Sequence, residues 1–176
     1  MGAWPLESLH SKTICGISRC GTENSKTGGD AEAAKSSGMI LLDTNVISEL
    51  MCREPSAQVV AWIEQRPRSR LGITAITQAG VLYGIEFSAK GRRKQALLTA
   101  AQTMFSEDFR GRIFPFNSDA AYAFARISTI RQTQGKPISQ LDAQIAAIVQ
   151  TLGAELATRN VTDFEGCGIK VLNPWH

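Results

Sequence analysis

The sequence contains little histidine, and this shortage excludes several kinds of enzyme. Of the two histidines, His10 lies in a polar N-terminal region and His176 is the last residue. Enzymes that activate a serine or cysteine nucleophile usually depend on a nearby histidine base. A Ser-His-Asp or Cys-His enzyme is therefore not expected, and catalysis here should depend on carboxylates, a metal ion or both.

Long apolar runs are also missing. No segment reaches the ~18 apolar residues of a membrane-spanning helix, and no apolar stretch with a small-residue cleavage site marks a secretory signal. The four cysteines are too scattered for a disulfide scaffold in a chain of 176 residues, and no two pairs have zinc-ligand spacing. They are Cys15, Cys20, Cys52 and Cys167. These absences favour one globular domain in the cytoplasm, with no membrane partner.

The chain divides into two unequal parts. Residues 21–38 contain no apolar side chain larger than alanine, so they cannot bury enough surface to offset the entropy of ordering. We therefore expect residues 1–38 to be a disordered extension or an over-extended reading frame, with Met39 as a natural start. Residues 39–176 are the expected folded domain.

From residue 39 onward, apolar runs alternate with segments of helical periodicity. The expected strands cover residues 39–42, 71–75, 113–116, 155–158 and 169–172. The expected helices cover residues 56–65, 77–89, 92–105, 119–133 and 139–151. This alternation predicts a three-layer α/β domain with a mostly parallel central sheet, in which Pro115 makes its strand an edge. A Rossmann dinucleotide site is not expected, because no Gly-x-Gly-x-x-Gly follows the first strand.

Three acidic residues occupy positions that this fold can bring together. Asp43 follows the first strand, Asp163 lies beyond the fourth, and Asp142 begins the helix before the fourth strand. Ligands of such sheets gather at the carboxyl ends of the strands. Clustered carboxylates repel one another unless a cation neutralises them, and oxygen ligands without histidine favour Mg²⁺ or Mn²⁺ over zinc.

Each acid also has an explanation that involves no catalysis. Asp43 can cap the helix that follows it, and Asp142 lies three residues after Ser139, as in a capping box. Asp163, with Asn160, can be a turn residue. Composition and spacing alone leave both interpretations open.

Several ordered motifs extend the prediction. Residues 39–48, Met-Ile-Leu-Leu-Asp-Thr-Asn-Val-Ile-Ser, resemble the opening of PIN domains, specifically the VapC/FitB-like toxins of bacterial type II toxin–antitoxin modules. The similarity continues through residues 73–79, 83–86, 135–146, 156–164 and 173–175. It implies a PIN-like three-layer sandwich and a toxin that acts as a Mg²⁺- or Mn²⁺-dependent ribonuclease on RNA such as tRNA. It also implies a homodimer and a cognate VapB/FitA-like antitoxin.

The resemblance also assigns roles to individual residues. Asp43 and Asp142 correspond to metal-binding catalytic carboxylates. Asp163 corresponds to a further catalytic acid, which binds a second ion or orients the attacking water. The supporting polar positions are Thr44, Asn45, Thr158 and Asn160.

One position departs from the family pattern. The family has a glutamate early in the helix after the second strand, where this chain has Gly80, and Glu86 lies six positions further on. We therefore expect a toxin whose activity is weakened. The alternative is an inert PIN domain that only binds its antitoxin. A structural explanation is that Gly80 and Gly84, four residues apart, permit close helix packing.

Two clusters of basic residues remain. One consists of Arg66, Arg68 and Arg70, and the other consists of Arg92, Arg93 and Lys94 at the start of an expected helix. Solvated loops are the simple explanation of both. Cations at a helix N-terminus oppose the helix dipole, so the second cluster is a candidate for binding RNA phosphates or an acidic partner segment.

Overall fold

A computed structural model describes residues 38–176, and the predictions for residues 1–37 lie outside this range. The strands are β1 (Ile40–Leu42), β2 (Leu71–Thr74), β3 (Ile113–Phe114), β4 (Glu155–Ala157) and β5 (Lys170–Leu172). The α-helices are α2 (Thr44–Leu50), α3 (Ala57–Glu64), α4 (Ala75–Phe87), α5 (Arg92–Thr103), α6 (Ser118–Thr133) and α7 (Gln140–Leu152). Short helical turns are η1 (Arg68–Arg70), η2 (Met104–Asp108) and η3 (Val161–Phe164).

The sheet has the strand order β3-β2-β1-β4-β5, and each of its pairings is parallel. In this order β1 is central, and β3, the strand that precedes Pro115, is at one edge. Leu42 pairs with Ile73 of β2 on one side and with Ala157 of β4 on the other. The carboxyl ends of these three strands therefore meet at the same edge of the sheet.

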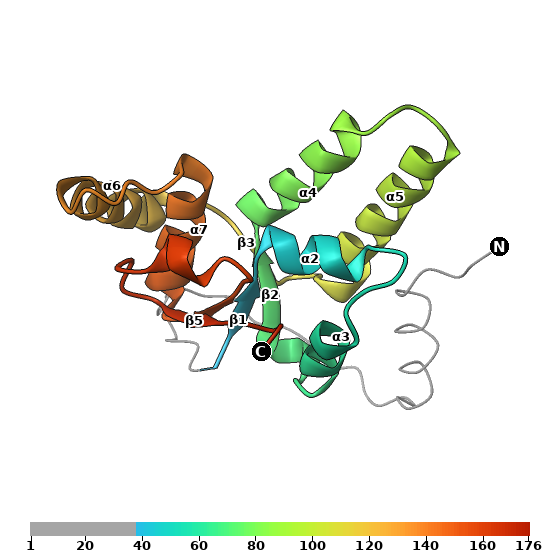
Figure 1. The fold of residues 1–176 in the computed structure, drawn as a ribbon, viewed down its shortest axis with the longest axis horizontal. Coiled ribbons are helices and arrows are strands. Elements are labelled where there is room, and N and C mark those ends of the chain that lie inside the picture. Colours follow the sequence, from blue (N-terminus) through green and yellow to red (C-terminus); the bar gives the residue numbers. More distant parts are fainter. Residues whose placement is uncertain (1–37) are drawn as a thin grey trace, which may run out of the picture.

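Helices cover both faces of the sheet, which confirms the predicted three-layer α/β fold. Ile40 and Leu42 of β1 belong to an apolar cluster that α2, α3, α4 and α5 complete. Leu41 points to the opposite face, where α6 and α7 complete a second cluster. Figure 1 shows these two groups of helices on opposite sides of the sheet. The alternation of side chains along a strand explains how three consecutive residues serve both cores.

Helix α7 matches its predicted boundaries closely because both ends carry strong signals. The hydroxyl of Ser139 accepts a hydrogen bond from the backbone N–H of Asp142, which caps the first turn. Gly153 ends the helix in a left-handed conformation, with φ of 59°. The apolar residues between them are largely buried, so the start of α7 is held firmly and presents Asp142 at a defined position.

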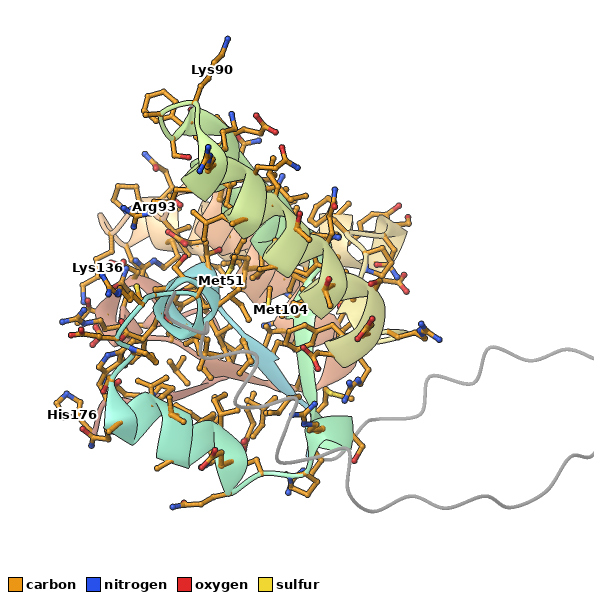
Figure 2. The ribbon with its side chains drawn as sticks, turned by 90° about the vertical axis from the view of Figure 1, so that its right-hand side faces the viewer. Met51, Lys90, Arg93, Met104, Lys136 and His176 are labelled. Atoms are coloured by element: carbon orange, nitrogen blue, oxygen red, sulfur yellow. The ribbon has the colours of Figure 1, made fainter. Side chains whose placement is uncertain are left out.

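Helices α4 and α5 form a hairpin that extends away from the sheet (Figure 1). Lys90 lies at its far end (Figure 2). The predicted helix over 92–105 is wrong at its C-terminal end, because α5 stops at Thr103 and the π-helical turn η2 follows. Met104 and Phe105 in this turn, and Phe109 directly after it, are buried in the core. The change from the regular helix thus coincides with the burial of these large side chains.

Within residues 38–176, no helix combines the length and the apolar character needed to cross a membrane.

Candidate metal site

Asp43 lies at the centre of the edge where the strands end. Its backbone N–H donates to the carbonyl of Ala157 at 2.9 Å, which extends the ladder between β1 and β4 by one bond. Asp43 is also the N-cap of α2, so the chain turns from strand to helix at this residue. Only 5% of its surface is exposed. The backbone therefore places a buried carboxylate at the carboxyl end of the central strand.

Three donors bind the Asp43 carboxylate. The backbone N–H of Thr44 donates to Oδ1 at 2.6 Å. The side-chain amide of Asn45 donates to Oδ2 at 2.9 Å, and the hydroxyl of Thr158 donates to the same oxygen at 2.7 Å. Hydrogen bonds of this kind orient a carboxylate and stabilise its charged form.

Asn45 and Thr158 are themselves held in place by the loop after β4. The amide of Asn45 donates to the Thr158 hydroxyl at 2.9 Å, and its carbonyl oxygen accepts from the backbone N–H of Arg159 at 3.2 Å. The backbone N–H of Asn160 donates to Thr158 Oγ1 at 3.1 Å. This set of residues (43, 45 and 158–160) forms one connected network, which we call the Asp43 network. It contains three of the four predicted supporting residues, Asn45, Thr158 and Asn160.

The pKa of Asp43 is raised above its ordinary value. Burial is the largest cause, because it disfavours the charged carboxylate, and the nearby charge of Asp142 raises the pKa further. The hydrogen bonds from Thr158, Thr44 and Asn45 act in the opposite direction. A buried carboxylate whose ionisation is unfavourable gains most from a cation placed beside it.

Asp142 is close enough to Asp43 to act on it electrostatically. It also takes part in the cap of α7, since its Oδ2 accepts a hydrogen bond from the Ser139 hydroxyl at 2.6 Å. The capping explanation that the sequence offered therefore holds for Asp142, and its metal-binding role stays a prediction. Asp43 likewise caps α2 and lies at the sheet edge, and its metal-binding role also stays a prediction.

Asp163 is placed differently from the other two acids. It is exposed on the short turn η3, where its backbone N–H donates to the carbonyl of Asn160 at 3.2 Å, as a turn residue would. Within residues 38–176, no group of three or more His, Cys, Asp or Glu residues is arranged to hold a metal ion. Asp163 therefore does not join Asp43 and Asp142 in a three-acid group in this part of the chain.

Gly80 lies on α4 and faces this edge of the sheet. A Cβ atom at residue 80 would lie 3.2 Å from Thr44 Oγ1 and 3.3 Å from Thr44 Cγ2. A Cβ atom at residue 84 would meet no atom within 4 Å. Close packing explains Gly80 but not Gly84, so the structural explanation for the two glycines holds for one of them. The predicted supporting residue Thr44 thus occupies space beside the position of the absent glutamate.

The second basic cluster lies at the start of α5. Arg92 and Arg93 are exposed. Lys94 forms an ion pair with the Glu86 carboxylate at 2.6 Å and also donates to the Glu86 carbonyl at 2.7 Å. Lys94 therefore has an internal structural role, which the sequence did not predict.

The first basic cluster is used internally as well. Arg66 lies over the ring of Trp62, 3.4 Å from its centroid, and Arg68 pairs with Asp108 at 3.0 Å. Arg70 donates to the carbonyl of Gly38 at 2.6 Å. Arg68 and Arg70 are exposed, so the explanation of solvated loops still holds for them, and their contacts join the loop before β2 to its surroundings.

Sequence reasoning missed a second polar pair at this edge. Thr74 ends β2 and is fully buried, and its hydroxyl lies 2.9 Å from the hydroxyl of Thr77 in the first turn of α4. Thr74 Oγ1 also accepts the backbone N–H of Thr77 at 2.9 Å. A threonine between a strand and a helix is a capping signal that could have indicated this arrangement.

Comparison with known proteins places this geometry in a family. The sequence profile of the PIN domain matches residues 40–165. The chain is 36% identical to VapC ribonuclease Y4jK of Sinorhizobium fredii over 137 residues, which are 78% of this chain and 98% of that protein. It is also 36% identical to toxin FitB of Neisseria gonorrhoeae over 138 residues, 78% of this chain and 99% of that toxin.

This chain belongs to the PIN domain family and to its VapC/FitB group of toxins. A solved structure agrees: the crystal structure of FitAcB from Neisseria gonorrhoeae superposes with a TM-score of 0.75 at 36% identity. The match covers 78% of this chain and 99% of the chain in the FitAcB structure. The prediction of a PIN-fold toxin of the VapBC and FitAB type is confirmed. The roles predicted for single residues of this PIN domain stay predictions.

Proposed function

We propose that this protein is the toxin of a type II toxin–antitoxin module and cleaves RNA with the help of Mg²⁺ or Mn²⁺. Its relatives include proteins named as ribonucleases and as toxins. The observation that carries the proposal is Asp43, a buried carboxylate with three donors at the carboxyl end of the central strand. Structural neighbours that are toxin–antitoxin complexes support a VapB/FitA-like antitoxin as the partner. A homodimer is part of the proposal.

The oxygen atoms around Asp43 suit a hard divalent cation. Asp43 and Asp142 would hold the ion, and water or phosphate oxygens would complete its shell, as Mg²⁺ prefers. When bound, the ion stabilises negative charge that develops on the phosphate during cleavage. Thr158 and Asn45 keep the Asp43 carboxylate oriented, since both donate to Oδ2. In this proposal Asp163 acts from η3, by orienting water or by binding a second ion.

The lack of a third nearby acid makes a second function a real candidate. Gly80 contributes no side chain beside Thr44, and no three-acid group is present within residues 38–176. Loss of a metal-binding carboxylate costs at least the ~10–100-fold in affinity or activity that outer-shell changes cost. The protein is then a weakened ribonuclease, or an inert PIN domain that binds antitoxin without cleaving RNA.

Calorimetric titration with Mn²⁺ separates these two functions. We expect the full chain to bind Mn²⁺, Asp43→Asn to abolish binding, and Gly80→Glu to strengthen it. Gly84→Glu is the matched control, because it makes the same change on the same helix where a Cβ meets open space. An RNA-cleavage assay of the same four proteins should follow the same order. Absence of Mn²⁺ binding and of cleavage in wild type and Gly80→Glu would refute the nuclease and favour the antitoxin-binding module.

A further inference from the structure

Arg159 directly follows Thr158 in the Asp43 network, and its backbone is fixed there. The backbone N–H of Arg159 donates to Asn45 Oδ1 at 3.2 Å. The preceding residue, Thr158, donates its hydroxyl to the Asp43 carboxylate. The side chain of Arg159 is exposed. The backbone of a cationic residue thus belongs to the same segment that holds the buried carboxylate.

An aromatic ring near the C-terminus restrains this cation. The guanidinium carbon of Arg159 lies 5.5 Å from the ring centroid of Trp175, within the range of a cation–π contact. Trp175 is half-buried against the apolar cluster around β1, and its backbone N–H donates to Asn173 Oδ1 at 3.0 Å. The ring is therefore anchored, and it limits the freedom of a long side chain without neutralising its charge.

The charge of Arg159 has no carboxylate partner in the part of the chain that the structure describes. Lys94 and Lys170, in contrast, form ion pairs with Glu86 and Glu155. A planar guanidinium offers two parallel donors that match two oxygens of a phosphate group. A phosphate that approaches the Asp43 carboxylate is repelled by it, and a fixed cation at the rim reduces this repulsion.

We propose that Arg159 is a phosphate-binding residue for RNA at the Asp43 site and that Trp175 positions it. This inference rests on the proposed function, because it names a substrate contact at the same site. Arg159 then contributes to RNA binding but takes no part in binding the metal ion. Removing it should weaken RNA binding without weakening Mn²⁺ binding, which is the opposite of the effect expected for Asp43.

The test measures binding separately from cleavage. A short fluorescently labelled single-stranded RNA of mixed sequence is titrated with the full chain in EDTA, at several salt concentrations. Arg159→Gln should lower affinity roughly tenfold and reduce the slope of log K against log salt by about 0.7. Arg110→Gln is the matched control, since Arg110 is an exposed arginine just before β3, at the opposite ends of the strands. It should leave both quantities nearly unchanged.

Two outcomes would overturn the proposal, the first from this titration and the second from a separate calorimetric titration with Mn²⁺. One is an unchanged affinity and salt slope in Arg159→Gln, as expected if Arg159 meets an acidic protein partner instead. The other is loss of Mn²⁺ affinity in the same variant, which would indicate a structural role. If RNA binding depends on Arg159 but wild type cleaves no RNA, the proposed nuclease function fails while this inference stands.

Trp175 provides an independent test of positioning. Trp175→Leu should weaken RNA binding when Arg159 is present and have no further effect in an Arg159→Gln background. Trp175→Phe keeps an aromatic face and should restore binding close to that of the wild type. Equal losses from Trp175→Leu in both backgrounds would show that the tryptophan acts only through stability.

Discussion

The Oγ1 atom of Thr44 lies 3.2 Å from the position that a Cβ atom would take at residue 80. This relationship joins the first helical residue after Asp43 to the middle of α4. Contacts between 3.0 and 3.4 Å are tighter than nine in ten real Cβ contacts, so any side chain at residue 80 requires Thr44 to shift by a few tenths of an ångström. The packing of α2 on α4 is thus adapted to glycine at this point.

The first prediction concerns stability at the two glycines of α4. Replacing an interior helical glycine by alanine stabilises a helix by up to ~1 kcal/mol. Gly84→Ala should gain close to this amount, because its Cβ meets open space. Gly80→Ala should gain less or lose stability, because its Cβ crowds Thr44. Chemical denaturation of both variants checks the order, and equal gains would contradict the close contact.

The second prediction concerns the hydroxyl of Thr158. Thr158→Val removes the donor to Asp43 and leaves the donors of Asn45 and Asn160 without their shared acceptor. We expect a loss of about 1–3 kcal/mol in the free energy of unfolding and about 10–100-fold in Mn²⁺ affinity. Thr158→Ser keeps the hydroxyl and should stay close to wild type. Wild-type Mn²⁺ binding by Thr158→Val would exclude a supporting role.

The third prediction concerns pH. The pKa of Asp43 is raised, chiefly by burial, so the folded state holds this proton more tightly than the unfolded chain does. Mn²⁺ binding should therefore weaken as the pH falls through the raised pKa, at a higher pH than for an ordinary aspartate. Ionised Asp43 also costs stability in the absence of metal. This cost is absent below the unfolded pKa and complete above the folded pKa.

Comparing the wild type with Asp43→Asn isolates the effect of Asp43 ionisation on the stability of the fold. The stability of Asp43→Asn relative to wild type, measured without divalent ions, should increase as the pH rises through the raised pKa. The increase is expected because the variant has no charge to bury. A difference that does not change with pH would show that Asp43 titrates as an ordinary exposed aspartate.

The fourth prediction separates the members of the basic cluster on α5. Arg92 and Arg93 are exposed, whereas Lys94 is paired with Glu86. Reversing both arginine charges (Arg92→Glu with Arg93→Glu) should weaken RNA binding and lower its salt dependence. Lys94→Gln should affect RNA binding little, because that charge already has a partner. An equal effect of Lys94→Gln would show that the ion pair opens when RNA binds.

The sequence was sufficient to predict most of the architecture because the signals were local. Ser139 caps the start of α7, and Pro115 follows the edge strand. Each of these signals depends on the backbone of neighbouring residues. The end of α5 was not predictable in the same way, because η2 forms where Phe105 and Phe109 reach the core. The residue at which α5 ends depends on the shape of the core, which segments distant in the sequence form.

The site was predictable in position but not in geometry. Strand order places Asp43 and Thr158 at the same edge, and the motif resemblance named both. The exposure of Asp163, the pairing of Lys94 with Glu86 and the contact of Arg159 with Trp175 all depend on side-chain directions. The periodicity of apolar residues along the sequence does not predict how side chains from separate helices, strands and loops point toward one another. The exposure of Asp163 in particular leaves no group of three acids at this edge in the part of the chain that the structure describes.

The central position of β1 has a consequence for when the site can exist. The bond between Thr158 and Asp43 joins residues 115 positions apart, and the backbone bond from Asp43 reaches β4. Contacts so distant in sequence form only after the intervening chain is available to fold. During synthesis, the first strand must wait for nearly the whole domain before its carboxylate gains these partners. In unfinished chains that end before β4, Asp43 therefore lacks its bonds to Ala157 and Thr158, and the Asp43 network stays incomplete.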